Sequence, residues 1–195
     1  MKKRILLPLL ALVVLAGVVI GGKAWLDERE RKAQYQARRE METRLEAVCE
    51  SEGVAEAAAY PSARDLHPVL YVKQTTVGFR ANFSGYRTPE GWGPQTLADA
   101  ELVACIVEDQ VELQRCSYTL EDGRKGTIIR VQYQTAVTLR AAQTGEVIAA
   151  NEFTGGIPRE CSDQETFKDN KLTRSLGGTR PDEAIAEWLR TYVEP

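Results

Sequence analysis

The sequence predicts an α+β protein. We expect an N-terminal transmembrane helix and a helical stalk, then a mainly antiparallel sheet of about five strands with a C-terminal helix packed on it. Three observations support this prediction. An uncharged apolar run opens the chain, and a charged helix-forming stretch follows. The spacing of the hydrophobic residues then changes from the helical period of 3.6 to the strand period of 2. With 195 residues, 43% hydrophobic and 27% charged, the chain has room for an anchor and one globular domain.

Residues 5–22 form the predicted anchor, a signal-anchor helix in contact with the lipid bilayer. These 18 residues carry no charge and follow Lys2, Lys3 and Arg4. As a helix they reach about 27 Å, close to the hydrocarbon thickness of a bilayer. By the positive-inside rule, residues 1–4 stay in the cytoplasm and everything after Lys23 crosses the membrane. The sequence therefore predicts a single-pass membrane protein with an extracytoplasmic domain.

A cleaved signal peptide is the alternative to an anchor. Its apolar region is usually about 7–15 residues long and ends at a small-x-small site. The nearest such pattern here, Gly22-Lys-Ala24, has lysine in the middle. A lipidated N-terminus is excluded because Leu15-Ala-Gly17 precedes valine rather than the cysteine that would accept lipid.

Residues 23–50 are predicted to form a charged helical stalk. The stretch from Lys23 to Glu50 contains neither Pro nor Gly. Opposite charges recur in it at helical spacing, as in Glu28–Lys32 and Glu40–Arg44. A plain spacer is the favoured interpretation. A homo-oligomer held together through the stalk is the alternative, because an apolar stripe runs along it: Leu26, Ala33, Ala37, Met41, Leu45 and Val48. Residues 51–64, rich in alanine, form a predicted linker.

Residues 65–195 form the predicted outer domain. Its clearest strand is 129–139, in which every second residue from Ile129 to Leu139 belongs to one face. A turn at 143–145 makes a hairpin with 146–154. The segments 68–76 and 102–107 are also expected to be strands, and 114–120 is expected to pair back onto 102–107.

The connections and the last helix complete the predicted domain. Glycines, prolines and aromatics in 79–94 indicate a long loop, 121–126 a turn, and 155–178 a polar loop. A capping signal at Thr179-Arg-Pro-Asp182 starts a helix. Its apolar stripe is expected to pack on the sheet: Ile185, Trp188, Leu189 and Tyr192.

Four cysteines lie on the predicted outer side of the membrane, where disulfides persist: Cys49, Cys105, Cys116 and Cys161. They allow three complete pairings. A hairpin centred on 110–111 would bring Cys105 opposite Cys116, so we favour that bridge. Cys49 is then left to pair with Cys161, or with a second copy across the stalk.

No group of residues forms a recognisable catalytic centre, cofactor site or metal site. The only histidine, His67, has no evident partner and is predicted to be a surface residue. No two cysteines have zinc-ligand spacing. Neighbouring carboxylates such as Glu108-Asp109 are expected in turns and caps, and in a strand they would point to opposite faces. Residues 51–195 carry 15 Lys and Arg against 21 Asp and Glu, which argues against nucleic acid as a partner.

Tyr86 and Trp92 are the candidate partner-binding residues. They lie among glycines and prolines in the predicted loop 79–94, and long loops on rigid scaffolds often bind partners. The alternative, which we favour, is that both rings cover the sheet as part of the core.

Short motifs in the last 95 or so residues resemble a family of uncharacterised bacterial membrane-anchored extracytoplasmic proteins. The motifs are Val103-Ala-Cys105, Val137-Thr-Leu139, Thr144-Gly-Glu-Val147, Phe153-Thr-Gly155 with Pro158, and Pro181 with Trp188-Leu189. This resemblance implies the fold and the compartment, and brings no activity with it. The domain is also similar to envelope lipoprotein domains that assist secretion or cell-wall assembly, although here an anchor replaces the lipidated cysteine.

The sequence thus favours a non-enzymatic binding or assembly domain whose partner is an envelope protein. An envelope enzyme would need carboxylates from separate strands to converge in a cleft. The remaining alternative is a structural protein that oligomerises through its stalk.

Overall fold

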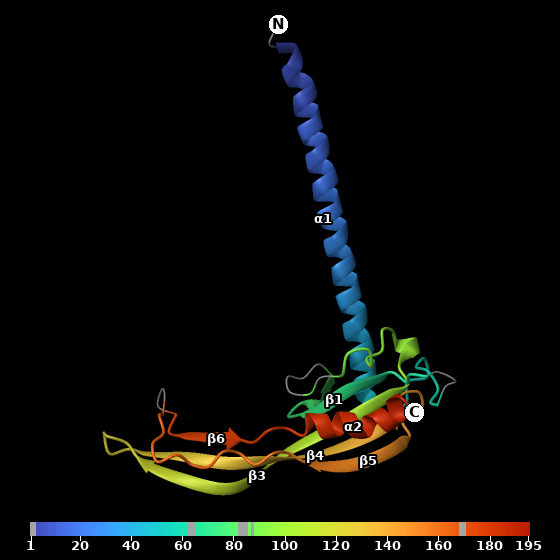
Figure 1. Cartoon of the computed structure of the whole chain (residues 1–195). Helices are drawn as coiled ribbons and strands as arrows, with labels where there is room; N and C mark the ends of the chain where they lie inside the picture. Colours follow the sequence, from blue (N-terminus) through green and yellow to red (C-terminus); the bar gives the residue numbers. More distant parts are fainter. Residues whose placement is uncertain (1–2, 62–64, 82–85, 87, 168–170) are drawn as a thin grey trace. The chain divides into compact units, whose positions relative to one another are not determined.

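The computed structural model describes residues 3–61, 65–81, 86, 88–167 and 171–195, with side chains from Trp25 onward. The chain divides into two compact units, Met1–Met41 and Glu42–Pro195. The second unit holds a six-stranded sheet, and Figure 1 shows the path of the chain through it. The predicted α+β class is confirmed.

The first unit consists of helix α1, which runs from Lys3 to Glu46 and so also supplies the first residues of the second unit. The side chains of 25–40 are almost all exposed, and Glu28 pairs with Arg31 at 2.6 Å and with Lys32 at 3.3 Å. The predicted membrane span 5–22 lies outside the residues whose side chains are described. Within the described part of the chain, no helix has the length and apolar composition needed to cross a membrane.

The sheet has the strand order β2-β1-β3-β4-β5, and β6 also pairs with β4. The strands are β1 (Val69–Thr75), β2 (Gly78–Ala81), β3 (Leu102–Thr119), β4 (Lys125–Ala141), β5 (Val147–Thr154) and β6 (Thr173–Gly177). The sheet is mixed and not purely antiparallel: β1 is parallel to β3 and β6 is parallel to β4, whereas the other three pairs are antiparallel. Both parallel pairs are joined by connections of more than a dozen residues, long enough for a crossover.

The predicted break in β3 does not exist. Residues 102–119 form one strand that pairs with β4 along its whole length, from Leu102 opposite Ala141 to Thr119 opposite Lys125. The segment lacks Gly, Pro and Asn, and Asp109 is the one turn-favouring residue near the predicted reversal, which is a weak turn signal. The chain reverses instead at the predicted turn, where Gly123 has a φ of 81°.

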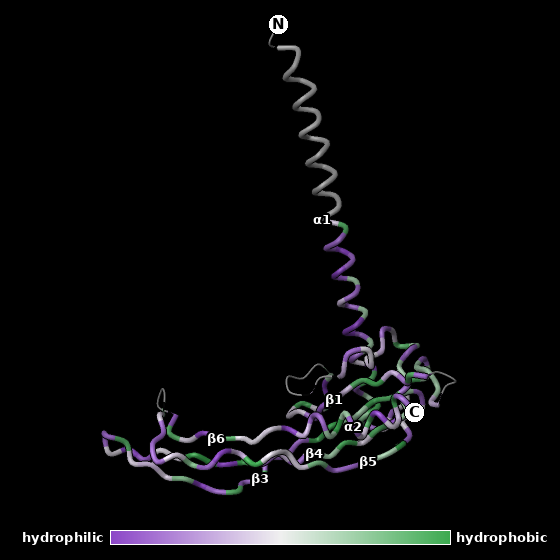
Figure 2. The backbone as a smooth tube through the Cα atoms, viewed as in Figure 1, coloured by the Kyte–Doolittle hydropathy of each residue, from purple (hydrophilic) through white to green (hydrophobic). Residues whose placement is uncertain are grey.

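The hydrophobic core lies between one face of the sheet and helix α2 (Asp182–Val193). The predicted alternation along β4 is largely confirmed: Val131, Val137 and Leu139 are buried, with Ile106 of β3 beside them. From the helix, Ile185, Leu189 and Val193 are fully buried in the same cluster. Figure 2 shows hydrophobic stretches gathered where α2 meets β1 and the adjoining parts of β3 and β4.

The 3-10 helix Ala47–Glu50 follows α1 and is joined to β3 by the Cys49–Cys105 disulfide. Just before it, Leu45 is fully buried. The Glu46 carboxylate accepts hydrogen bonds from the backbone N–H of Ala81 (2.9 Å) and from Arg80 (3.2 Å). The end of α1 is thereby fixed to the edge of β2.

The distal parts of β3 and β4 extend beyond β1 and β5 and form, with β6, an arm (residues 107–131, 155–167 and 171–177; Figure 1). Thus part of the predicted polar loop 155–178 is a strand, β6, which pairs with 127–131 of β4. The arm is a single layer of sheet, and most side chains on its β3 strand are exposed.

Candidate binding surface

The structure buries both residues of the predicted partner-binding loop. Tyr86 is 6% exposed and Trp92 is 4% exposed, and both belong to the core beneath α2. The Trp92 indole Nε1–H donates a hydrogen bond to Glu194 at 2.7 Å, which ties this segment to the end of α2. Neither ring offers an open face to a partner in this arrangement.

A buried charge cluster surrounds the Glu108 carboxylate, whose side chain is 6% exposed. Lys73 Nζ donates to its Oε1 at 2.6 Å, and Arg180 Nε donates to its Oε2 at 2.6 Å. The Tyr86 hydroxyl donates to Oε2 at 2.8 Å and lies 2.8 Å from the hydroxyl of Thr135. The cluster therefore joins β1, β3, β4, the Tyr86 segment and the start of α2.

The contacts of Glu108 keep it ionised. Burial alone would raise the pKa of its carboxyl, but hydrogen bonds from Arg180, Lys73 and Tyr86 outweigh burial and hold the pKa below its usual range. Burial raises the pKa of Asp182 nearby, with Arg180 opposing that shift. Both oxygens of Glu108 are occupied, so the cluster fixes the fold and leaves no carboxylate oxygen open to a substrate.

Sequence reasoning missed this cluster. Its members come from five separate stretches of chain, and Glu108 was expected in a turn or cap rather than in the middle of a strand. The one local signal is Lys73, which continues an apolar strand directly after Val72 and is buried. A buried lysine needs a counter-charge.

The prediction that His67 is a surface residue is wrong. His67 is 3% exposed, and its Nδ1 lies 2.7 Å from Oε2 of Glu101, which is fully buried. The backbone N–H of His67 donates to the carbonyl of Val193 in α2 at 2.9 Å. Its partner Glu101 is 34 residues away in sequence, so no local pattern could reveal the pair.

All four cysteines are disulfide-bonded, but the favoured pairing is wrong. The bonds are Cys49–Cys105 and Cys116–Cys161, with Cα–Cα distances of 5.5 Å and 6.4 Å. Because Cys105 and Cys116 lie on the same uninterrupted strand, eleven residues apart, their Cα atoms are separated by about 36 Å. No disulfide can join them.

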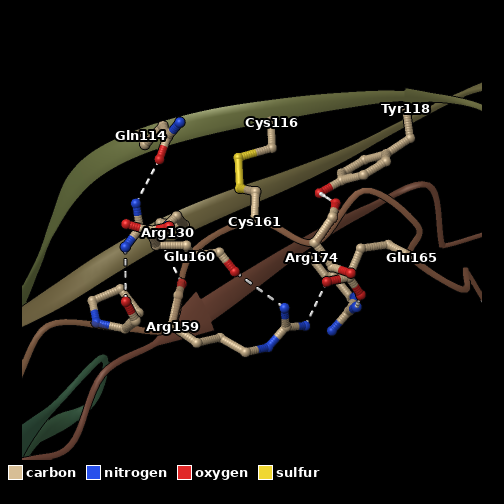
Figure 3. The surroundings of a disulfide bond; sticks show 11 residues. Gln114, Cys116, Tyr118, Arg130, Arg159, Glu160, Cys161, Glu165 and Arg174 are labelled. Atoms are coloured by element: carbon tan, nitrogen blue, oxygen red, sulfur yellow. Dashed lines mark hydrogen bonds and ion pairs between the residues drawn. A yellow bond between two sulfur atoms is a disulfide. The ribbon is translucent and has the colours of Figure 1, made fainter.

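The Cys116–Cys161 disulfide fastens the segment 155–167 to one face of the arm (Figure 3). Arg130 donates to the carbonyls of Pro158 (2.8 Å) and Arg159 (2.9 Å). The Glu165 carboxylate pairs with both Arg159 and Arg174, and these contacts lower its pKa. The arm thus combines a covalent bond and a polar network with a small amount of apolar packing, in which Ile128 is fully buried and the rings of Tyr118 and Phe167 lie 5.8 Å apart.

The most open feature of the domain is the outer edge of β5. This strand pairs only with β4, and among the described residues no other backbone group is hydrogen-bonded to it. Five of its eight side chains are exposed. It contains neither Pro nor Gly, and Glu152 is its only charge. Natural edge strands are usually protected by such devices or by bulges. The register shift of β5 lies near its start, between the partners of Leu139 and Arg140, so Ala149–Thr154 is a poorly protected edge.

A strip of three aromatic rings lies beside this edge. Phe153 of β5 packs against Trp188 of α2 with ring centroids 5.7 Å apart, and Trp188 packs against Tyr192 at 5.5 Å. All three are only partly buried. We call Phe153, Trp188 and Tyr192 the aromatic strip. An unpaired backbone ladder beside half-exposed rings can accept an extended peptide chain.

The other free edges are less suitable. The distal half of β3 is also unpaired on its outer side, but a register shift between Glu112 and Gln114 interrupts it near its middle, whereas the register shift of β5 lies near its start and leaves Ala149–Thr154 in regular pairing. A bulge of this kind twists an edge away from further pairing. β2 and β6 are short, with four and five residues. β5 is therefore the best candidate for strand addition in the described part of the domain.

In the described part of the chain, no three His, Cys, Asp or Glu side chains gather in a way that could hold a metal ion. Comparison with known protein families, curated proteins and solved structures found no match to this chain.

Proposed function

We propose that this chain is a non-enzymatic, membrane-tethered binding or assembly domain of the bacterial cell envelope. It binds an extended segment of an envelope protein as an added strand on β5. The observation that carries the proposal is the unpaired edge of β5 beside the aromatic strip. In strand addition, main-chain hydrogen bonds supply affinity and flanking side chains supply specificity.

Two further observations support the compartment and the absence of catalysis. Two disulfides are typical of a domain that folds in an oxidising compartment outside the cytoplasm. Glu108 and His67, two side chains with the chemistry for acid–base work, are buried and hydrogen-bonded within the fold, and the exposed carboxylates of Asp109 and Glu152 lie on strands that are separated by β4. A general acid or base needs to reach a substrate proton.

Site-specific photo-crosslinking in cells tests this proposal. A photoreactive residue replaces Asn151, which is exposed on β5, in the full-length chain. The matched control replaces Ser117, which is exposed on the arm portion of β3. The proposal predicts one major envelope-protein adduct from position 151, mapped to a single short segment of that protein. An equal yield of the same adduct from position 117, or no adduct from 151, would contradict it.

A further inference from the structure

The face of the sheet opposite the aromatic strip carries an uncompensated negative charge beside β5. A shallow hollow of about 180 Å³ lies there, lined by residues of β3, β4 and β5: Val107, Asp109, Gln134, Thr135, Ala136, Glu152, Phe153 and Thr154. Its two charged members, Asp109 and Glu152, are both acidic and exposed. Among the described residues, neither forms an ion pair, and no Lys or Arg lines the hollow.

The register of the sheet places the hollow and the strip on opposite faces of the same strand. Phe153 lies opposite Thr135, which is buried on the α2 side, whereas Glu152 lies opposite exposed Ala136. Neighbouring residues of a strand point to opposite faces. A strand added to β5 would therefore place one side chain beside the aromatic strip and the next beside Glu152.

We infer that the partner segment of β5 has alternating chemistry, with apolar residues next to lysine or arginine. An apolar side chain covers the aromatic strip and gains from its burial. The adjacent basic side chain lies across from Glu152, where cross-strand neighbours have Cβ atoms about 5 Å apart and opposite charges attract. Asp109, two strands further in, adds to the attraction for a long lysine or arginine side chain. This inference rests on the proposed strand addition and names its ligand class.

The test uses two peptides and the full-length chain in detergent micelles. The first peptide is acetyl-Thr-Val-Lys-Val-Lys-Val-Thr-amide, which presents valines on one face and lysines on the other. The second has glutamate in place of both lysines. Binding is measured by calorimetry at 150 mM salt, a concentration that screens distant charges but preserves close pairs. The inference predicts that the lysine peptide binds about tenfold more tightly than the glutamate peptide.

Charge reversal on the protein provides the decisive comparison. Glu152→Lys is expected to reverse the order of the two peptides, because the charge beside the added strand changes sign. Glu121→Lys makes the same change of net charge at the exposed tip of the arm and is expected to leave the order as in the wild type. Equal effects of the two variants would mean that only net charge matters, and would overturn the inference.

The remaining outcomes separate the inference from the proposed function. If both peptides bind wild-type protein equally well, and Glu152→Lys changes neither affinity, the ligand class is wrong while strand addition stands. If neither peptide binds at millimolar concentration, both are overturned. Light scattering on the same samples tests the other occupant: a dimer that binds neither peptide, where the monomer binds the lysine peptide, would show a second copy on β5 and overturn the inference.

Discussion

Phe153 on β5 and Trp188 on α2 lie edge to face, with ring centroids 5.7 Å apart and ring planes at 61°. This contact joins the outermost strand of the sheet to the helix that covers the core. Because both rings remain partly exposed, their contact also forms a surface that continues to Tyr192. The same residues therefore contribute to stability and define the proposed binding strip.

Trp188→Leu is expected to weaken binding of the lysine peptide at least threefold while keeping the domain folded. Leucine preserves an apolar, helix-forming side chain but removes both ring contacts, each worth about 1 kcal/mol beyond burial. Calorimetry gives the affinity and urea unfolding gives the stability. Trp25→Leu, in the exposed part of α1, is the matched control. If the two variants bind the peptide equally well, the aromatic strip is not part of the binding surface.

Glu108→Gln is expected to lower the free energy of unfolding at pH 7 by about 3 kcal/mol, because it leaves Lys73 and Arg180 without the counter-charge between them. Urea denaturation measures the loss. Glu112→Gln on the same strand breaks an exposed pair with Arg115 and is expected to have no measurable effect.

The stabilising effect of Glu108 is expected to depend on pH. The pKa of Glu108 in the folded protein is lower than its ordinary value of 4.5, so the carboxylate stabilises the fold above that pH. Its contribution is lost as the pH falls below 4.5 toward the folded-state pKa. We expect the stability of the wild type to decline in that range, and the decline to be shallower in Glu108→Gln. Parallel curves would show that Glu108 does not titrate as its contacts imply.

Two buried tyrosines allow a hydrogen-bonded hydroxyl to be compared with one that has no hydrogen-bond partner among the described residues. Tyr86→Phe is expected to destabilise the domain by about 1–3 kcal/mol, because it removes a donor to Glu108 and a partner of Thr135. The buried Tyr71 hydroxyl has no hydrogen-bond partner among the described residues. Tyr71→Phe is therefore expected to leave stability unchanged or to raise it. Urea unfolding of both variants measures the free energy of unfolding. An equal loss of stability in the two variants would contradict the assigned hydrogen bonds.

The two disulfides are expected to protect different parts of the domain. They close segments with sequence separations of 56 and 45 residues, so each contributes about 4 kcal/mol by constraining the unfolded chain. Replacing Cys116 and Cys161 by serine should increase amide hydrogen exchange in the arm, because this bond is the covalent link between 155–167 and β3. Replacing Cys49 and Cys105 should increase it at Ala47–Glu50 and in β1. Exchange that rises over the whole domain in both variants would contradict this division.

Sequence patterns predicted the elements whose contacts are local or periodic. The stripe of Ile185 and Leu189 predicted the buried face of α2, and the alternation in 129–139 predicted which side of β4 faces the core. The hairpin from β4 to β5 was equally clear from Thr144-Gly145. In each case the signal lies within a few residues, because side-chain period and turn chemistry are local properties.

Features that depend on distant residues could not be predicted. The continuous strand over 108–119 was not predicted because most of its side chains are polar. The arm is exposed on much of its surface, so its strands do not show the apolar alternation of a half-buried strand. The error about the disulfides followed from the hairpin that was expected there. Glu108 and His67 acquire their roles from Arg180 and Glu101, and only the folded chain brings these residues together.

Addition of an extended chain to β5 can be observed by intermolecular nuclear Overhauser effects between the lysine peptide and the isotope-labelled full-length chain. We expect backbone contacts from the peptide to successive residues of Val147–Thr154, together with contacts from the valine methyl groups to the ring of Trp188. Contacts that map instead to the free edge of β3, or a bound peptide with no backbone contact to β5, would contradict strand addition.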